Sequence, residues 1–158
     1  MRVREYLSLV KFSHSVFALP FALCGAWLGS ARVPPIRVLG LVVGCAVAAR
    51  TAAMAFNRLV DREIDARNPR TRTRELPAGR VSTASVAGWV VVASSVFVVL
   101  AFALNRTSGL LSFPVLAVLL AYSYVKRFSL AAHFVLGLAL ALAPLGAWIA
   151  VRGGFDGA

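Results

Sequence analysis

The chain has 158 residues, of which 59% are apolar and 15% are charged, and its mean hydropathy is +0.80. This composition belongs to membrane proteins. The net charge of +11 does not indicate nucleic acid, because the arginines are interleaved with acids and lie between apolar runs too long for a basic arm. Excess Lys and Arg in one set of loops is the ordinary membrane pattern. We therefore expect a lipid bilayer as a partner and no nucleic acid.

Five apolar runs remain when the sequence is cut at its charged residues, and each is long enough to cross about 30 Å of hydrocarbon as a helix. They cover about residues 12–31, 38–56, 81–105, 107–125 and 128–151. We expect an all-α membrane protein, a bundle of about five transmembrane helices that forms one domain over residues 1–158. A cleaved signal peptide is disfavoured, because the first run contains Pro20 and a second apolar run follows it at once.

Short connections join most of these runs, and Lys126-Arg127 is expected to be a tight one. Within the runs, Gly25 with Gly29 and Gly40 with Gly44 form two GxxxG patterns. Small residues at this spacing let membrane helices approach closely. We therefore expect both patterns to serve helix packing.

The distribution of basic residues predicts the orientation of the bundle. With the N-terminus in the cytoplasm, twelve basic residues fall in cytoplasmic segments and four on the other side. This bias follows the positive-inside rule. We expect a multi-pass protein of a bacterial-type inner (plasma) membrane, with the N-terminus and the loop 57–80 in the cytoplasm.

Residues 57–80, NRLVDREIDARNPRTRTRELPAGR, form a polar island that holds four of the six acids and seven of the seventeen basic residues. On a helix, Arg50, Asn57 and Asp61 fall close to one line, and Asp65 follows one turn later, slightly off it. Carboxylates one turn apart repel each other unless a cation lies between them. Mg²⁺ suits this arrangement, since it takes one or two carboxylates and lets substrate phosphates complete its shell.

The arginines of the island supply the complementary part, because guanidinium groups bind phosphate oxygens at two points. The island therefore predicts a diphosphate held through Mg²⁺. The alternative interpretation is a charged cytoplasmic loop that only fixes the topology.

Polar residues inside the apolar runs are costly in lipid and so invite a functional interpretation. His14 lies one turn into the first run, either at headgroup level or in an acceptor pocket. Tyr122 and Lys126 are four apart and share a helix face. This pair either contributes to a functional site, or Tyr122 is an aromatic residue at the membrane interface and Lys126 only sets the topology. His133, alone in the fifth run, is expected to be a core residue.

The runs 57–65 and 68–79 resemble the first aspartate-rich motif of the UbiA superfamily of intramembrane prenyltransferases. The stretches KFSHSVFALPFA at 11–22 and YSYVKR at 122–127 agree with this resemblance, which covers essentially the whole chain. The chain looks most like the 4-hydroxybenzoate polyprenyltransferases of ubiquinone and menaquinone biosynthesis. Many members have a second acid after the Asn, where this chain has Arg58. In that respect it also looks like the protohaem farnesyltransferases of the same superfamily.

The resemblance implies transfer of a polyprenyl group from polyprenyl diphosphate to an aromatic acceptor such as 4-hydroxybenzoate. It implies that Asp61 and Asp65 coordinate Mg²⁺ with Asn57 completing the shell, and these three are the expected catalytic residues. A YxxxK pattern at the place of Tyr122 and Lys126 lies near the diphosphate in the family. The expected substrate-binding residues are Arg50, Arg72, Arg74, Tyr122, Lys126 and His14.

Members of the superfamily have about nine spans and two aspartate-rich motifs, whereas no second carboxylate cluster follows Lys126 here. The chain therefore looks like the N-terminal half of the fold, and a C-terminal half is an expected partner. We expect no measurable prenyl transfer by this chain alone. The alternative is a non-catalytic membrane subunit that binds a lipid diphosphate. A CDP-alcohol phosphotransferase is disfavoured, because its DG element and the Gly at the right offset are missing.

Overall fold

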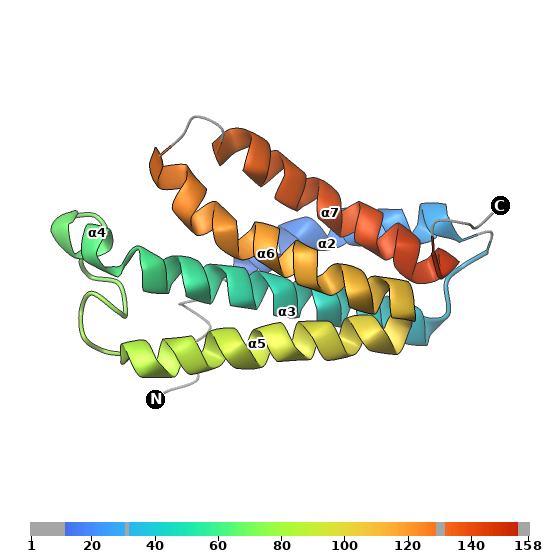
Figure 1. Cartoon of the computed structure of the whole chain (residues 1–158), viewed down its shortest axis with the longest axis horizontal. Helices are drawn as coiled ribbons and strands as arrows, with labels where there is room; N and C mark the ends of the chain where they lie inside the picture. The colour runs from blue at the N-terminus through green and yellow to red at the C-terminus, as the bar shows by residue number, and fades with distance from the viewer. Residues whose placement is uncertain (1–11, 31, 129–131, 155–158) are drawn as a thin grey trace.

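The computed structural model describes residues 12–30, 32–128 and 132–154, and the side chains of residues 12–18, 128 and 132 lie outside the description. Within this part the chain is helical and has no strand, so the all-α prediction is confirmed. The helices run side by side as a bundle, with α4 projecting beyond one end (Figure 1). Their bounds are α2 Phe12–Gly29, α3 Ile36–Val60, α4 Arg62–Arg67, α5 Thr83–Leu104, α6 Arg106–Phe128 and α7 Ala132–Arg152.

Four of the described helices, α3, α5, α6 and α7, are long and apolar enough to cross a membrane. The described apolar part of α2, Leu19–Gly29, is shorter. Large apolar side chains such as Trp27, Val99 and Phe134 are exposed on the outer faces of the bundle. An apolar surface this extensive is not stable against water and matches hydrocarbon. The chain is an integral membrane protein.

Two helices extend beyond the apolar runs. α3 continues from the run 38–56 to Val60, so Asn57 lies in its last turns, in line with the helical interpretation of Asn57 and Asp61. α6 continues to Phe128, which places Lys126 and Arg127 in its last turn and makes the prediction of a tight connection at these residues wrong. The helices continue because backbone groups near the membrane need partners, and a helix supplies them internally. Long basic side chains at a helix end can still reach polar surroundings.

Glycines set the closest approach between two helices, α2 and α7. A Cβ atom built at Gly25 would overlap the backbone carbonyl of Pro144, and one at Gly29 would lie 2.9 Å from the carbonyl oxygen of Trp148. The packing role predicted for this GxxxG pattern is confirmed. The second pattern differs, because a Cβ at Gly40 would meet nothing within 4 Å. The prediction of close packing is wrong at Gly40.

Polar side chains join three helix ends at the end of the bundle opposite α4 (Figure 1). The Asn105 amide nitrogen donates to the carbonyl oxygens of Ile149 (3.3 Å) and Ala150 (3.0 Å) at the end of α7. Its amide oxygen accepts from the backbone N–H of Ser108 at 2.7 Å, in the first turn of α6. The hydroxyl of Thr107 donates to the carbonyl of Gly153 at 3.2 Å. These contacts satisfy helix-end groups that would otherwise lack partners.

Candidate active site

The polar island is a folded segment, with its middle held against the bundle by apolar side chains. Leu76 and Val81 are buried together with Ala55 of α3 and Val86 of α5. A backbone turn at Gly79 lets the chain reverse, because its φ of +69° lies in the left-handed region that glycine adopts without strain. The island is therefore anchored between α3 and α5.

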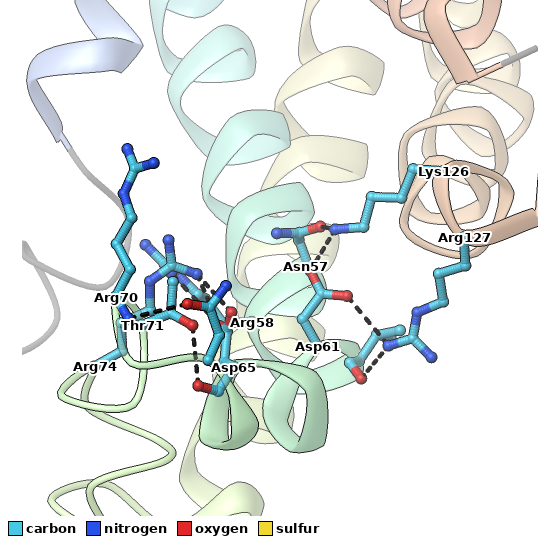
Figure 2. A network of polar contacts seen from close by, with 11 residues as sticks. Asn57, Arg58, Asp61, Asp65, Arg70, Thr71, Arg74, Lys126 and Arg127 are labelled. Atoms are coloured by element: carbon cyan, nitrogen blue, oxygen red, sulfur yellow. Dashed lines mark hydrogen bonds and ion pairs between the residues drawn. The ribbon is translucent and has the colours of Figure 1, made fainter. Parts of the chain in front are cut away.

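Asn57 and Asp61 meet the end of α6 in a contact group that we name the Asp61 cluster: Asn57, Asp61, Lys126 and Arg127. The ammonium group of Lys126 donates to Asn57 Oδ1 and to Asp61 Oδ2 (Figure 2). Arg127 donates from Nη2 to Asp61 Oδ1 at 3.1 Å and also to the carbonyl oxygen of Val60. One buried carboxylate is thus shared between two basic residues that follow it by more than sixty positions in the sequence.

Asp65 belongs to a separate group, the Asp65 cluster: Arg58, Asp65, Thr71 and Arg74. Nη1 of Arg74 lies 2.8 Å from both carboxylate oxygens of Asp65. Nη1 of Arg58 lies 3.9 Å from Asp65 Oδ2. The Thr71 hydroxyl donates to the backbone carbonyl of Asp65 at 2.9 Å. Asp65 therefore binds the loop that follows it.

The two carboxylates expected on one helix face are divided between these clusters (Figure 2). The reason is local: α3 ends at Val60, and Asp61, with φ −81° and ψ 1°, joins it to α4. A residue near ψ 0° departs from regular helix geometry, so the next turn no longer continues the face of the preceding one. Straight-helix geometry predicted the approach of Asn57 and Asp61, and Asp65 lies beyond the straight part.

The charged residues of the island differ in burial, since most of its acids are buried and most of its arginines are exposed. Asp61, Asp65 and Glu75 are 9%, 7% and 8% exposed, whereas Glu63 is exposed beside Arg62. Of the seven arginines, Arg58 is buried and Arg74 is half-buried. The other five are exposed: Arg62, Arg67, Arg70, Arg72 and Arg80. Acids inside and arginines outside give this end of the bundle a positive surface.

An open cavity of about 370 Å³ begins at the Asp61 cluster and runs between α3, α6 and α7 toward the opposite end. Asn57, Lys126, Tyr122 and Arg50 contribute to its lining near the cluster. The rest of its lining is almost entirely apolar and includes many alanines. The cavity thus joins a polar mouth to an apolar interior, a shape suited to a ligand with a charged head and an apolar tail.

Arg50, predicted to pair with Asp61 or a diphosphate, instead lines the cavity, and Asp61 is paired with Lys126 and Arg127. The Nε atom of Arg50 is buried and has no hydrogen-bond partner among the described residues. Arg72 is exposed on the loop and Arg74 binds Asp65. His14 lies in α2, but its side chain is outside the described part of the chain.

Three residues of the two clusters were not predicted as site residues from the sequence: Arg127, Arg58 and Thr71. Arg127 directly follows Lys126, and the position of the pair at the end of an apolar run was the available signal. Arg58 was noted only as a departure from a family pattern. Thr71 carried no signal, because its contact depends on how the loop folds back over six residues.

The oxygens of Asn57 and Asp61 suit a divalent metal such as Mg²⁺. Both face one point, which the Lys126 ammonium occupies in this structure, so a positive charge already lies where these oxygens converge. Amide and carboxylate oxygens are the hard ligands that Mg²⁺ prefers, with ligand phosphates and water completing its shell. No group of three or more His, Cys, Asp and Glu side chains suited to a metal occurs in the described part of the chain.

Comparison with known proteins relates this geometry to one family. The sequence model of the UbiA prenyltransferase family matches residues 18–158. The chain is 37% identical over 134 residues to a protoheme IX farnesyltransferase of Anaeromyxobacter dehalogenans, covering 84% of this chain and 45% of the relative. It is 32% identical over 137 residues to a 4-hydroxybenzoate octaprenyltransferase of Actinobacillus pleuropneumoniae, covering 85% and 47%.

Solved structures agree with the sequence matches. The apo structure of a UbiA homolog from Aeropyrum pernix K1 superposes with a TM-score of 0.82 at 36% identity, over 89% of this chain and 51% of that one. A UbiA homolog from Archaeoglobus fulgidus, bound to DMAPP and Mg²⁺, shares the fold with a TM-score of 0.79 at 19% identity, over 95% and 54%. The chain spans about half the length of these proteins. It belongs to the UbiA prenyltransferase family.

Proposed function

We propose that this chain forms the metal- and diphosphate-binding half of a Mg²⁺-dependent membrane prenyltransferase, which transfers a polyprenyl group from its diphosphate to an aromatic acceptor such as 4-hydroxybenzoate. One observation carries the proposal. Oxygens of Asn57 and Asp61 converge on the ammonium group of Lys126, at the mouth of an apolar cavity inside a membrane bundle. Membership of the family and the names of its relatives agree with it.

Asn57 and Asp61 would hold the metal, which would supply positive charge to the departing diphosphate. Lys126 would then exchange its contacts with these oxygens for the phosphate oxygens, since it lies at the same point. Tyr122, one helical turn earlier, also lines the cavity. Groups that contact the leaving group more strongly as charge builds up on it lower the barrier to transfer.

The loop arginines Arg72 and Arg74 would approach the diphosphate from the water side. Arg72 is exposed and lies directly after Thr71, whose contact holds this part of the loop. Arg74 already presents Nη1 to a carboxylate, and a guanidinium binds phosphate in the same way. Asp65, the third expected metal ligand, is bound to Arg74 in this structure.

The apolar cavity would take the polyprenyl tail. Each CH₂ group kept out of water is worth about 0.8 kcal/mol, so a tail of several prenyl units is held strongly by such a lining. Arg50 lies within this lining with its Nε atom unpartnered, and we propose that it contacts an oxygen of a bound substrate. His14 would belong to the acceptor pocket. Exclusion of water from the lined region would protect the reactive prenyl group from hydrolysis.

Transfer of a farnesyl group to protohaem is the second candidate. The chain is similar to proteins named protoheme IX farnesyltransferase, with 37% identity to one of them. It also has Arg58 where many aromatic prenyltransferases have an acid, a feature it shares with the protohaem branch. Assays with both acceptors separate the two candidates.

A second bundle would complete the enzyme, because the relatives are about twice as long as this chain. We propose that the additional carboxylates needed around a diphosphate come from that half. Removal of one contact that stabilises a transition state costs about 2.7–4 kcal/mol, a factor of roughly 10²–10³ in rate. Purified chain should therefore bind a prenyl diphosphate but transfer no prenyl group until a C-terminal half from a relative is co-expressed.

We propose that the loop 57–80 faces the cytoplasm, on the side favoured by the distribution of basic residues. In a variant lacking Cys24 and Cys45, a cysteine introduced at Ala78 should react with an impermeant thiol reagent only from the cytoplasmic side. Ala78 suits this test because it is exposed. A cysteine at Val33, which is also exposed, should react only from the other side, and reversed labelling would overturn the orientation.

The metal assignment is tested by equilibrium binding of geranyl diphosphate to the purified chain at several Mg²⁺ concentrations. Asp61→Ala should abolish the Mg²⁺-dependent part of binding. Glu63→Ala is the matched control, since Glu63 lies two residues away but is exposed and pairs only with the exposed Arg62 among the described residues. Equal binding by both variants, or binding that needs no Mg²⁺, would contradict the proposal.

A further inference from the structure

We propose that Asp65 is a positioning residue that holds the loop 68–80, and not a ligand of the metal. The inference rests on the proposed function, because it divides the expected metal set of Asn57, Asp61 and Asp65 into two roles. Asn57 and Asp61 take the metal. Asp65 acts through the arginines of the loop that it anchors.

The partners of the two carboxylates carry this distinction. Asp61 is bound by Lys126 and Arg127, which come from another helix, and Lys126 lines the mouth of the cavity. Asp65 is bound by groups from its own segment: Arg74 at 2.8 Å to both oxygens and Arg58 at 3.9 Å. Neither carboxylate lines the cavity itself, but Asn57 and Lys126, which meet at Asp61, do, whereas no member of the Asp65 cluster does. The Asp65 carboxylate lies beside Arg58 and Arg74, in a group apart from that of Asn57 and Asp61 (Figure 2).

Electrostatics disfavours a metal at Asp65. Two guanidinium groups already lie beside the Asp65 carboxylate, which is 7% exposed. A divalent cation there would stand within a few ångströms of both arginines. Repulsion between such charges is strong away from bulk water. The metal would have to displace Arg74, and Arg58 would remain because it is buried in α3.

The Asp65 cluster fixes the part of the loop that carries the phosphate-binding candidates. Arg74 ties residue 74 back to Asp65, and the Thr71 hydroxyl ties residue 71 to the carbonyl of the same residue. The backbone N–H groups of Thr71 and Arg72 both donate to the carbonyl of Asn68, at 3.0 and 2.9 Å. Arg72 thus projects from a short segment held on both sides. Release of Asp65 would free that segment without touching Asn57 or Asp61.

The experiment uses the full chain and the variants Asp65→Asn, Arg74→Gln and Asp61→Asn, with Arg67→Gln as the control for loss of an exposed arginine. The first measurement is the rate of tryptic cleavage after Arg70 and Arg72 without ligand. The second is the Mg²⁺ concentration that gives half-maximal binding of geranyl diphosphate. Asp65→Asn and Arg74→Gln should each accelerate cleavage about tenfold, the loss expected for a hydrogen-bonded ion pair.

The same two variants should weaken diphosphate binding, Arg74→Gln at least as much as Asp65→Asn because Arg74 is also a proposed phosphate contact, while the Mg²⁺ requirement stays at the wild-type value. The double variant Asp65→Asn/Arg74→Gln should be cleaved no faster than either single one, because both remove the same contact that holds the loop. Asp61→Asn should do the reverse, with unchanged cleavage and a Mg²⁺ requirement raised at least tenfold. Arg67→Gln should match the wild type in both measurements.

A Mg²⁺ requirement raised by Asp65→Asn as much as by Asp61→Asn, and unchanged by Arg74→Gln, would show that Asp65 is a metal ligand and would overturn the inference. Cleavage unchanged in both Asp65→Asn and Arg74→Gln would overturn it as well. If the wild type shows no Mg²⁺-dependent binding, the proposed function fails, but the cleavage rates still decide whether Asp65 holds the loop. If Asp65→Asn does not fold, Arg74→Gln provides the same comparison.

Discussion

The two ends of the bundle are both closed by polar contacts between distant parts of the chain, yet the contacts differ in kind. At the Asn105 end, neutral side chains donate to backbone carbonyls of α7. At the Asp61 end, carboxylates and an amide oxygen are held by Lys126, Arg127 and Arg74. Backbone carbonyls at a helix end need a donor permanently, so the first set is structural. Ion pairs can exchange partners with an incoming metal and anion.

This difference indicates where the molecule can change without unfolding. The Asn105 amide satisfies groups on α6 and α7 at once, and its loss leaves these helix-end groups without the partners it supplies. The Asp61 cluster holds two basic groups and one acid. A bound anion can therefore replace Asp61 as the partner of one of these basic groups. The end with exchangeable contacts is also the end where the cavity has its polar mouth.

Ligand binding should give the largest effect, and only at the Asp61 end. At a free geranyl diphosphate and Mg²⁺ concentration one hundred times the dissociation constant, the free energy of unfolding should rise by about 2.7 kcal/mol. The increase appears as a higher Tm in a thermal unfolding assay. Asp61→Asn should lose it, whereas Asn105→Ala should retain the full increase over its own lower starting value. Loss of the increase in both variants would remove the distinction between the two ends.

Gly25→Ala tests the packing that keeps α2 against α7. The added methyl group would overlap the backbone carbonyl of Pro144, which cannot rotate away. Overpacking of this kind costs about 1–3 kcal/mol. The matched control is Gly40→Ala, where a Cβ meets nothing within 4 Å and helix propensity should make the change neutral or stabilising. Equal unfolding temperatures for the two variants would contradict the close approach.

Asn105→Ala should cost about 1–2 kcal/mol, the usual value for the loss of a helix N-cap. The side chain satisfies the Ser108 N–H and also reaches two carbonyl oxygens of α7, so the upper part of this range is expected. The unfolding temperature should fall, and the dissociation constant for geranyl diphosphate should not change. Weaker diphosphate binding in this variant would show that the two ends are coupled.

The smallest effect is expected for Glu63→Ala. Glu63 lies beside the clusters, but its carboxylate is exposed and pairs at 3.4 Å with an equally exposed arginine, Arg62. Exposed ion pairs of this kind contribute about 0–1 kcal/mol. Stability and diphosphate binding should both stay close to the wild-type values. A large loss of binding would mean that exposed charges of the island, and not the buried clusters, hold the ligand.

The helices themselves were predictable, because long apolar runs must form helices in a membrane. The helix boundaries were less so. The charged residues at which the runs were cut do not stop a helix, and both α3 and α6 continue past them to Val60 and Phe128. The GxxxG pattern at Gly25 predicted close packing, but it could not indicate that α7 is the neighbouring helix.

Helical spacing correctly brought Asn57 and Asp61 together, because both lie on or directly after the regular part of α3. It could not show that Asp65 turns toward Arg74, because that depends on the backbone at Asp61 and on a loop that folds back over nine residues. The family resemblance implied only that Lys126 lies near the diphosphate, and its contact with Asn57, 69 positions earlier, was not predicted. Periodicity describes one helix at a time, whereas the site is assembled from two.

The surplus of positive charge at the Asp61 end has a kinetic consequence. One carboxylate faces Lys126 and Arg127, so the Asp61 cluster has a surplus of one positive charge before any metal binds, and five arginines of the island are exposed. Beside a low-dielectric bundle, such a surplus creates an attractive field that extends into the surrounding water. Association of an anionic ligand should therefore be fast at low ionic strength and slow as salt screens the field, while the residence time of the bound ligand changes much less.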